Sequence, residues 1–303
     1  MLRFSIVIPN LNSGGTLERA ILSVLNQNYS NVQLIVADGG SSDNSAEILS
    51  RFSDRIDILI RNKDNGQADG INRAFRRAEG DVFAWLCADD ELLPGALHHA
   101  AGLFETNPQA GVVAGGADRV FGVSFTSPAP IRPDAWHVIG LRNTLDQPSV
   151  FWRSEWHRRA GELDTSFDLA FDWEFWCRLK RAGAQLLITE RTLSRYYFSR
   201  TNKTSTGGGK HVDEGYRIVR KYGSHNGLMA RLYRGFYAWF DLHGCMDHPP
   251  SASKLRMLAF RAARLISLLT LGNAVAEYNW HFASLQQRGL DWWEGERRLL
   301  NDT

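Results

Sequence analysis

Adjacent carboxylates follow an apolar run in the first third of the chain. Residues 82–87 read VFAWLC, and Asp89, Asp90 and Glu91 come just after them. Like charges at the tip of a buried strand repel each other, and a divalent cation bridging to a phosphate would relieve that repulsion. The alternative is a solvated loop that caps the helix opened by Pro94.

A second candidate for chemistry is Asp172, which opens a predicted helix among Phe171, Trp173 and Phe175. Desolvation by these aromatic side chains would raise the pKa of the carboxyl group, which suits a general base. The alternative is an ordinary N-cap carboxylate, since aspartate is a preferred cap. Glu174 is a second candidate for the base.

Polar residues follow four predicted strands. They occupy positions 10–13, 38–43, 62–66 and 89–90. In open α/β sheets, ligands bind beyond the carboxyl ends of the strands. Four such groups on one edge therefore predict a single site, with residue types suited to a nucleotide.

The elements that must position these residues alternate along the first hundred positions. Strands are predicted at 4–9, 32–37, 56–60 and 82–87, with helices between them, the first at 17–26. This alternation predicts an α/β protein with a doubly wound, largely parallel sheet and right-handed crossovers.

The pattern beyond residue 94 is less regular. We expect helices at 94–106, 154–160 and 172–182, a strand pair at 111–117 and 119–125, and strands at 148–153 and 185–188. The proline-rich stretch 127–133 is predicted to be a mobile loop over the site.

Composition narrows the class of protein. The 303 residues carry a net charge of +2, which gives no electrostatic case for binding nucleic acid. Three distant cysteines form neither a disulfide framework nor a zinc spacing, so we expect a reducing compartment. The chain enters an apolar strand by residue 4, which does not resemble a signal peptide.

A polar, glycine-rich stretch at 201–210 marks a change in composition, and the pattern beyond it is helical. Arginines interrupt the apolar residues of 255–271, which is unlike a membrane span. This segment could lie on a membrane surface, pack on the main domain or form a homodimer. We therefore expect a cytoplasmic protein that is either free or peripheral on the inner face of the membrane.

Six blocks carry a family resemblance in order and spacing. They are FSIVIPNLNS (4–13), LIVADGGSSDNS (34–45), DNGQADGINRAF (64–75), GDVFAWLCADDELLPGAL (80–97), QPSVFWR (147–153) and FDWEFWCRLKRAG (171–183). Residues 4 to about 205 resemble an inverting family 2 glycosyltransferase of the GT-A fold, of a type common in bacterial surface-polysaccharide synthesis. The resemblance implies a mixed sheet with a nucleotide-binding half and an acceptor half in residues 1–205, and a helical C-terminal extension in 206–303.

The resemblance also implies a donor site. Asp38 would accept the N–H of a uracil or thymine ring, and glycine beside it lets the backbone approach the base. For Asp69 and Asn72 the alternative is solvation of a helix surface. The implied donor set is Pro9, Asn10, Asn12, Asp38, Gly40, Asn65, Gly66, Asp69, Asn72, Ala88, Asp89 and Asp90.

The family's metal motif usually begins with an aspartate, but Cys87 stands at that position here. The resemblance makes Asp89 and Asp90 the ligands of Mn²⁺ or Mg²⁺, a Lewis acid that stabilises the departing nucleoside diphosphate. In the family's acidic pair near residue 172, Phe171 replaces the glutamate and Asp172 remains as the base.

Further residues are implied on the acceptor and diphosphate sides. Gln147, Trp152 and Trp173 would shape acceptor binding. Arg200 and Lys203 would close over the diphosphate, although a solvated loop is the alternative for Arg200.

The function predicted from the sequence is transfer of a sugar from a nucleoside-diphosphate donor, with UDP or dTDP as the nucleotide, to a hydroxyl of a sugar or lipid-linked glycan. A sugar-1-phosphate nucleotidyltransferase would want a lysine pattern after the first strand that is absent here. A dinucleotide oxidoreductase would need G-x-G-x-x-G at that place. A non-catalytic nucleotide-sugar or glycan-binding module stays open because of Cys87 and Phe171.

Overall fold

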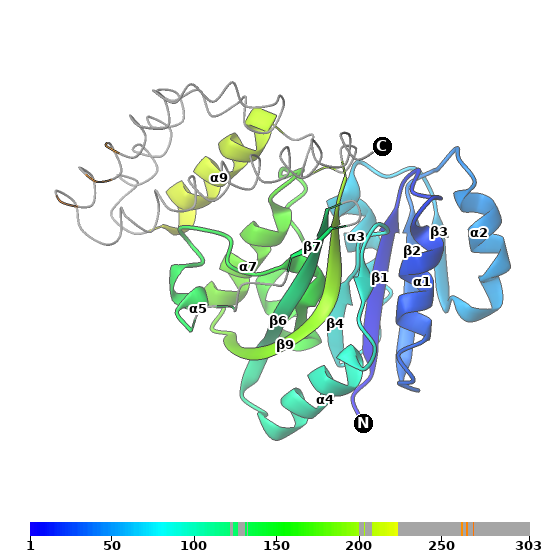
Figure 1. The fold of residues 1–303 in the computed structure, drawn as a ribbon, viewed down its shortest axis with the longest axis horizontal. Coiled ribbons are helices and arrows are strands. Elements are labelled where there is room, and N and C mark those ends of the chain that lie inside the picture. The colour runs from blue at the N-terminus through cyan, green and yellow to red at the C-terminus, as the bar shows by residue number, and fades with distance from the viewer. Residues whose placement is uncertain are drawn as a thin grey trace. The chain divides into compact units, whose positions relative to one another are not determined.

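The computed structural model describes residues 1–121, 124–126, 131, 133–199, 203 and 208–223, together with the single positions 262, 265 and 269 (Figure 1). Internal contacts divide the chain into two compact units. The first comprises residues 1–120, 125–136 and 144–197, and the second comprises 121–124, 137–143 and 198–303. Arg200, most of 127–133 and the segment 255–271, apart from three single positions, lie outside the described residues. The predicted domain boundary at 205 stays a prediction.

One mixed sheet organises the fold. Its strands are β1 (Phe4–Asn10), β2 (Val32–Asp38), β3 (Ile58–Arg61), β4 (Val82–Trp85), β5 (Glu91–Leu92), β6 (Ala110–Phe121), β7 (Ser124–Thr126), β8 (Val150–Arg153) and β9 (Gln185–Phe198). Their order is β3-β2-β1-β4-β8-β6-β9-β5, and β7 pairs with β6. The four strands β3, β2, β1 and β4 are parallel, whereas β8 is antiparallel to both β4 and β6. The predicted α/β class is confirmed.

Helices separate the strands along the chain. They are α1 (Leu17–Leu25), α2 (Ser45–Arg51), α3 (Gln67–Phe75), α4 (Ala96–Thr106), α5 (Ala135–Val138), α6 (Ser154–Ala160), α7 (Phe171–Arg181) and α9 (Gly208–Tyr222), with short 3-10 turns at Ser53–Arg55 and Gln147–Ser149. All seven residues of β1 are buried, as expected for a strand covered on both faces. Both α1 and α3 contact this strand.

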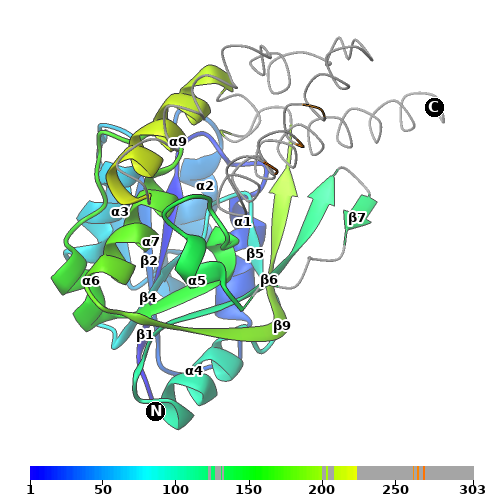
Figure 2. The same ribbon diagram turned by 90° about the vertical axis from the view of Figure 1, so that its left-hand side faces the viewer.

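Two strands differ from the prediction. The expected strand pair at 111–125 is largely one continuous strand, β6, because the glycines at its centre serve close packing: a Cβ on Gly115 would lie 2.6 Å from the carbonyl oxygen of Arg191. The expected strand at 185–188 continues to Phe198 as β9, whose charged residues suggested a loop. Figure 2 shows β9 curving beside β6.

The core beneath the central strands is aromatic. Trp85 on β4, Trp152 on β8 and Trp176 on α7 are each at most 1% exposed. The rings of Trp85 and Trp176 stack with centroids 5.3 Å apart and an interplanar angle of 9°. This cluster fixes α7 against the sheet, and α7 carries Asp172.

The second unit packs α9 against the segment 137–143. A Cβ on Gly140 would lie 2.5 Å from the carbonyl oxygen of Tyr222, so glycine permits this approach. Among the described residues, no helix is both long and apolar enough to cross a membrane.

Candidate functional site

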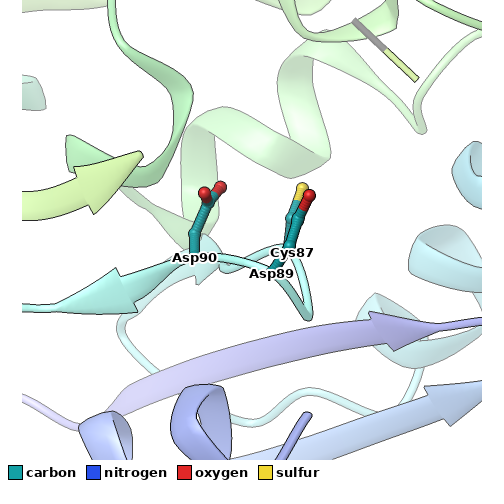
Figure 3. A group of neighbouring side chains, drawn as sticks. All are labelled: Cys87, Asp89 and Asp90. Atoms are coloured by element: carbon teal, nitrogen blue, oxygen red, sulfur yellow. The ribbon is translucent and has the colours of Figure 1, made fainter. Parts of the chain in front are cut away.

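An acidic loop joins β4 to β5 and holds the first group of the site. The ligand atoms of Cys87, Asp89 and Asp90 lie within 4.8 Å of one another, and the three side chains project to the same side of the loop (Figure 3). Asp90 is 1% exposed. Its Oδ1 accepts the Tyr197 N–H at 3.0 Å, whereas its Oδ2 has no hydrogen-bond partner among the described residues.

The electrostatics of this loop are unfavourable without a cation. Burial raises the pKa of Asp90 well above its usual range, and the charge of Asp89 raises it further. Burial also raises the pKa of Asp89, which Arg19 partly opposes. Carboxylate oxygens are the ligands that Mg²⁺ and Mn²⁺ prefer, and one of them here is buried without a partner. The residues present therefore fit a divalent cation.

Cys87 replaces a charge with a hydrogen-bonding thiol. Its Sγ accepts from Gln67 Nε2 at 3.4 Å and donates to Gln147 Oε1 at 3.5 Å. Burial raises the pKa of the thiol well above its usual value, and the charges of Asp90, Asp89 and Asp172 add to that shift. The thiol is therefore neutral.

Gln147 is held in place from two directions. Besides accepting from the thiol of Cys87, it donates through Nε2 to the carbonyl oxygen of Trp85 at 2.7 Å. These contacts make Gln147 part of the wall of the acidic loop. Its predicted acceptor contact stays a prediction.

Asp172 stands in the first turn of α7. The N-cap of this helix is Ala170, so Asp172 is the second helical residue and the cap interpretation is wrong. Its Oδ1 accepts the N–H of Trp173 at 2.7 Å. Its charge contributes to the upward shift of the pKa of the Cys87 thiol, after burial and the charges of Asp90 and Asp89. The role of Asp172 as the base stays a prediction.

Glu174, the other candidate for the base, is held in a buried ion pair with Arg178. It is fully buried, and Arg178 Nε donates to its Oε2 at 2.7 Å. The guanidinium of Arg178 also donates to the carbonyl oxygens of Ala160 and Gly161 at the end of α6. Glu174 therefore joins two helices.

A second polar group lies where β1 and β2 end side by side, with Asn10 paired to Asp38 in the sheet. Asp38 Oδ1 accepts from Asn10 Nδ2 at 2.9 Å and from Ser41 Oγ at 2.5 Å. Its Oδ2 lies 3.5 Å from Arg61 Nε and has no hydrogen-bond partner among the described residues. The Oδ2 atom of Asp38 is thus a buried acceptor beside the guanidinium of Arg61.

The turns around Asp38 approach one another closely. Gly40 has a φ of +96°, and Asn12 has a φ of 52° with its Oδ1 accepting the Ser42 N–H. A Cβ on Gly39 would lie 2.6 Å from the Asp64 carboxylate. A side chain at position 39 would require the Asp64 carboxylate to move. Pro9 is buried in β1, and Ala88 is buried in the acidic loop.

The predicted residues of the third loop are largely engaged with one another. Asp69 accepts the Asn65 N–H at 2.9 Å and pairs with Arg73 at 2.7 Å, contacts that lower its pKa. Asn65 and Gly66 are exposed, and Gly66 has a φ of +110°.

Two predicted contacts need correction. The amide of Asn72 is buried and bonded at both ends to the backbone of Leu163, at 2.9 Å and 2.8 Å, so it fixes a loop on α3. Trp152 is fully buried in the aromatic core and has no surface to offer an acceptor. Trp173, predicted with it, is 3% exposed. Polar and aromatic residues look alike in sequence whether they bind a ligand or the chain itself.

The two residues predicted to close over the diphosphate, Arg200 and Lys203, stay predictions. Arg200 lies outside the described residues, and Lys203 belongs to the second unit. In contrast, sequence reasoning missed Gln67, Arg19 and Tyr197 around the acidic loop. Tyr197 was missed because β9 was expected to end at 188, and Arg19 because it resembled an ordinary helix-surface residue.

Comparisons with known proteins agree with this arrangement. The profile described as "Glycosyl transferase family 2" matches residues 5–163. An uncharacterized glycosyltransferase of Nostoc is 30% identical over 146 residues, which cover 46% of this chain and 45% of that protein. A Campylobacter jejuni GalNAc(5)-diNAcBac-PP-undecaprenol beta-1,3-glucosyltransferase is 35% identical over 101 residues, 32% of this chain and 33% of that one. The matches thus span less than half of either relative.

Solved structures share the fold at low sequence identity. Staphylococcus aureus TarS in complex with UDP has a TM-score of 0.63 and 14% identity, and the likeness covers 98% of this chain and 91% of that one. The mannosyltransferase PcManGT of Pyrobaculum calidifontis, in complex with GDP-Man and Mn²⁺, has a TM-score of 0.57 and 14% identity, covering 95% and 87%. At this identity the likeness concerns the fold alone.

Proposed function

Because this chain belongs to glycosyltransferase family 2 and has the GT-A fold, we propose that it transfers a sugar from a nucleoside-diphosphate donor to a hydroxyl, with inversion and with a divalent metal. The observation that carries the proposal is the grouping of Cys87, Asp89 and Asp90, whose ligand atoms lie within 4.8 Å of one another, together with the charge of Asp172, which acts on the same thiol. A metal site and a base near one another are what displacement at a sugar diphosphate requires.

The donor nucleotide is proposed to bind at the ends of β1 and β2. Asp38 Oδ2 is a buried acceptor, suited to the N3–H of uracil or thymine, and Arg61 Nε lies 3.5 Å away to donate to a ring carbonyl. Cytosine presents no N–H at that position. Of the similar structures, TarS was solved with UDP and with UDP-GlcNAc, and PcManGT with GDP-Man. The proposed nucleotide is UDP or dTDP.

Asp89 and Asp90 would hold Mn²⁺ or Mg²⁺. The unpartnered Oδ2 of Asp90 supports this assignment, and Mn²⁺ is present with PcManGT. When bound, the cation would supply Lewis-acid stabilisation of the charge on the nucleoside diphosphate. This chain's own residues hold the two carboxylates in one loop and shield them from water.

Asp172 is proposed to act as the general base. Its carboxylate would accept the proton of the acceptor hydroxyl as that oxygen attacks the anomeric carbon. A single displacement with one base inverts the configuration at that carbon. The proposed acceptor is a sugar or lipid-linked glycan, and the Campylobacter relative, a GalNAc(5)-diNAcBac-PP-undecaprenol beta-1,3-glucosyltransferase, supports the second choice.

The first experiment is calorimetric titration with UDP, dTDP and GDP, each with Mn²⁺, with Mg²⁺ and with EDTA. We expect binding of UDP or dTDP that is tight only with metal and is lost in Asp89→Ala. Asp54→Asn, an exposed aspartate far along the chain from the loop, is the control. Nucleotide affinity that is the same with metal, with EDTA and in Asp89→Ala would overturn the metal assignment.

The second experiment separates an enzyme from a binding module. Asp172→Asn should lower turnover by ~10²–10⁴-fold, the usual contribution of general-base catalysis, while nucleotide binding is kept. Hydrolysis or transfer of a radiolabelled nucleotide sugar measures the turnover. If Asp172→Asn turns over like the unmodified protein, another residue is the base.

The role of residues 206–303 is proposed to be contact with a membrane surface or with a second copy. Flotation with liposomes, with and without residues 253–271, tests the first alternative, and sedimentation of the same two proteins tests the second. Equal behaviour of the two proteins in both measurements would exclude 253–271 from either role.

A further inference from the structure

Three polar side chains of α1 and the turn after it contact the acidic loop and the residues that follow it. We call them the polar stripe: Arg19, Ser23 and Gln27. Arg19 and Ser23 are four residues apart and lie on one face of α1, and Gln27 follows just beyond the end of the helix. Ser23 Oγ accepts the N–H of Leu92 at 3.1 Å, and Gln27 Nε2 donates to the carbonyl oxygen of Leu93 at 3.0 Å. The stripe therefore contacts the chain from the acidic loop to the start of α4.

Arg19 reaches the metal-binding pair itself. The Nη2 atom of Arg19 donates to the main-chain carbonyl oxygen of Asp89 at 2.5 Å, and its Nε lies 3.8 Å from the carboxylate of Glu91. Two residues of the loop are thus tied to one guanidinium. The side chain of Arg19 is only partly exposed, which limits its freedom.

The same guanidinium meets the end of β9. It lies over the ring of Tyr197, with its Cζ 3.7 Å from the centroid. The main-chain N–H of Tyr197 donates to Asp90 Oδ1 at 3.0 Å. Two residues earlier, Arg195 pairs with Glu91 at 2.6 Å, and the two residues are partners in the β5–β9 ladder. The loop is therefore held between α1 and β9.

We propose that Arg19 and Tyr197 form a clamp that positions the carboxylates of Asp89 and Asp90. Arg19 fixes the main chain at Asp89, Tyr197 fixes the carboxylate of Asp90, and the stacked guanidinium and ring fix the two anchors to each other. A planar guanidinium can stack on a ring and donate in its own plane at once, which a lysine ammonium cannot. Arg19 and Tyr197 are positioning residues, and the consequence for metal affinity rests on the proposed function.

Two measurements test the clamp, one of which needs no metal. Hydrogen exchange of the peptide spanning 86–93, followed by mass spectrometry without metal or nucleotide, reports order in the loop. Paramagnetic resonance of Mn²⁺, titrated in the presence of UDP, reports metal affinity. In Arg19→Met and Tyr197→Leu, we expect the loop to exchange at least ~10-fold faster and Mn²⁺ to dissociate ~10–100-fold more readily, as for other supports of metal ligands.

Matched variants separate positioning from general stability. Ser23→Ala belongs to the same stripe but releases only Leu92, so it should leave Mn²⁺ affinity unchanged. Binding of UDP in EDTA should be unchanged in Arg19→Met. The double variant Arg19→Met/Tyr197→Leu should lose no more Mn²⁺ affinity than the single variants, because the two residues act as one unit.

The outcomes are distinguishable. Unchanged exchange at 86–93 in both Arg19→Met and Tyr197→Leu overturns the clamp, whatever the protein's function. Faster exchange in these variants, in a protein that shows no metal-dependent nucleotide binding, upholds the clamp and overturns the proposed function. Faster exchange with unchanged Mn²⁺ affinity overturns the inference that the clamp positions metal ligands.

Discussion

Asp90 buries a carboxylate, one oxygen of which has no hydrogen-bond partner among the described residues. The side chain is 1% exposed, and Asp89 adds a like charge beside it. The arrangement costs stability unless a cation is bound, and it thus resembles other functional sites where stability is given up for chemistry.

We predict that Asp90→Asn stabilises the metal-free protein, because burial and the charge of Asp89 disfavour the ionised carboxylate and asparagine can still accept the Tyr197 N–H. Urea unfolding in EDTA measures the difference, with Asp54→Asn as the exposed control. The same variant should lose metal-dependent nucleotide binding. A destabilised Asp90→Asn would mean that the charge is favourably solvated.

The raised pKa values of Asp89 and Asp90 also predict the pH dependence of metal affinity. Protons compete with the cation for the same oxygens, so affinity for Mn²⁺ should fall on acidification and should begin to fall above the ordinary aspartate pKa of ~4. Titration of Mn²⁺ and UDP between pH 5 and 8, in buffers of differing ionisation enthalpy, measures the protons released. Release of no proton near neutral pH would contradict the raised values.

At this scale, residue type and order along the chain placed the acidic pair and Asp38 at strand ends and Asp172 at the start of a helix, whereas their binding and catalytic roles stay predictions. Residue type and order were not enough for Asn72, because its partner is the backbone of Leu163, 91 positions away. Trp152 shows the same limit, since an aromatic residue near a site can equally belong to the core. A single sequence does not say which partner satisfies a polar or aromatic side chain.

At the scale of elements, the junction of α6 and α7 positions Asp172. Arg178 pairs with the fully buried Glu174 and also donates to the carbonyl oxygens of Ala160 and Gly161 at the end of α6. The pair therefore joins the helix that carries the proposed base to its neighbour.

We predict that Arg178→Met destabilises the protein by ~3–5 kcal/mol, because it leaves a buried charge without its ion pair. Thermal and urea unfolding measure the loss. The double variant Arg178→Met/Glu174→Gln should recover much of it, since no charge then remains. Arg159→Met, which breaks an exposed pair with Glu155 on α6, is the control and should change stability by under ~1 kcal/mol. Equal losses of stability in Arg178→Met and Arg159→Met would contradict this account.

Element prediction succeeded where hydrophobic periodicity was regular. The first three helices and four strands were predicted with small errors at their ends. It fell short for β9, which extends beyond the predicted strand, because its pairing depends on distant partners such as Glu91, which pairs with Arg195.

At the scale of the whole molecule, one buried histidine links the core to pH. His157 is 7% exposed and packs between Phe75, Phe83 and Phe175, at centroid distances of 4.9 to 5.5 Å. Burial, with the charge of Arg178 second, lowers its pKa to about 4. The folded protein thus holds the neutral imidazole, whereas the unfolded chain titrates at ~6.5.

We predict that stability falls as pH decreases from ~6.5 to ~4, since only the unfolded chain takes up a proton in that window; His157 accounts for about 3 kcal/mol of the loss. Above pH ~6.5 both states are neutral and the contribution is fully present. Relative to the unmodified protein, His157→Phe should therefore gain stability on acidification, measured by urea unfolding at pH 7, 5.5 and 4.5. The exposed His98→Phe is the control, and a parallel response of the two variants would contradict the assignment.

The overall fold could be predicted because alternating strands and helices leave few topologies, and because the six sequence blocks resemble a family. The division into two units could not, because it depends on contacts between 137–143 and α9 that no local pattern records. The domain boundary at 205 was drawn from the change in composition at 201–210 and from the extent of the family resemblance.

The β5–β9 ladder has a consequence for the order in which the protein is made. Glu91 and its ladder partner Arg195 are separated by 104 positions, so a chain growing on the ribosome contains the acidic loop long before the strand that holds it. Domains generally fold as units during synthesis, and such distant pairings form late. The segment 5–163 matched by the family profile therefore lacks Arg195 and Tyr197, and in a nascent chain the contacts of these residues with Glu91 and Asp90 form only after β9 has emerged.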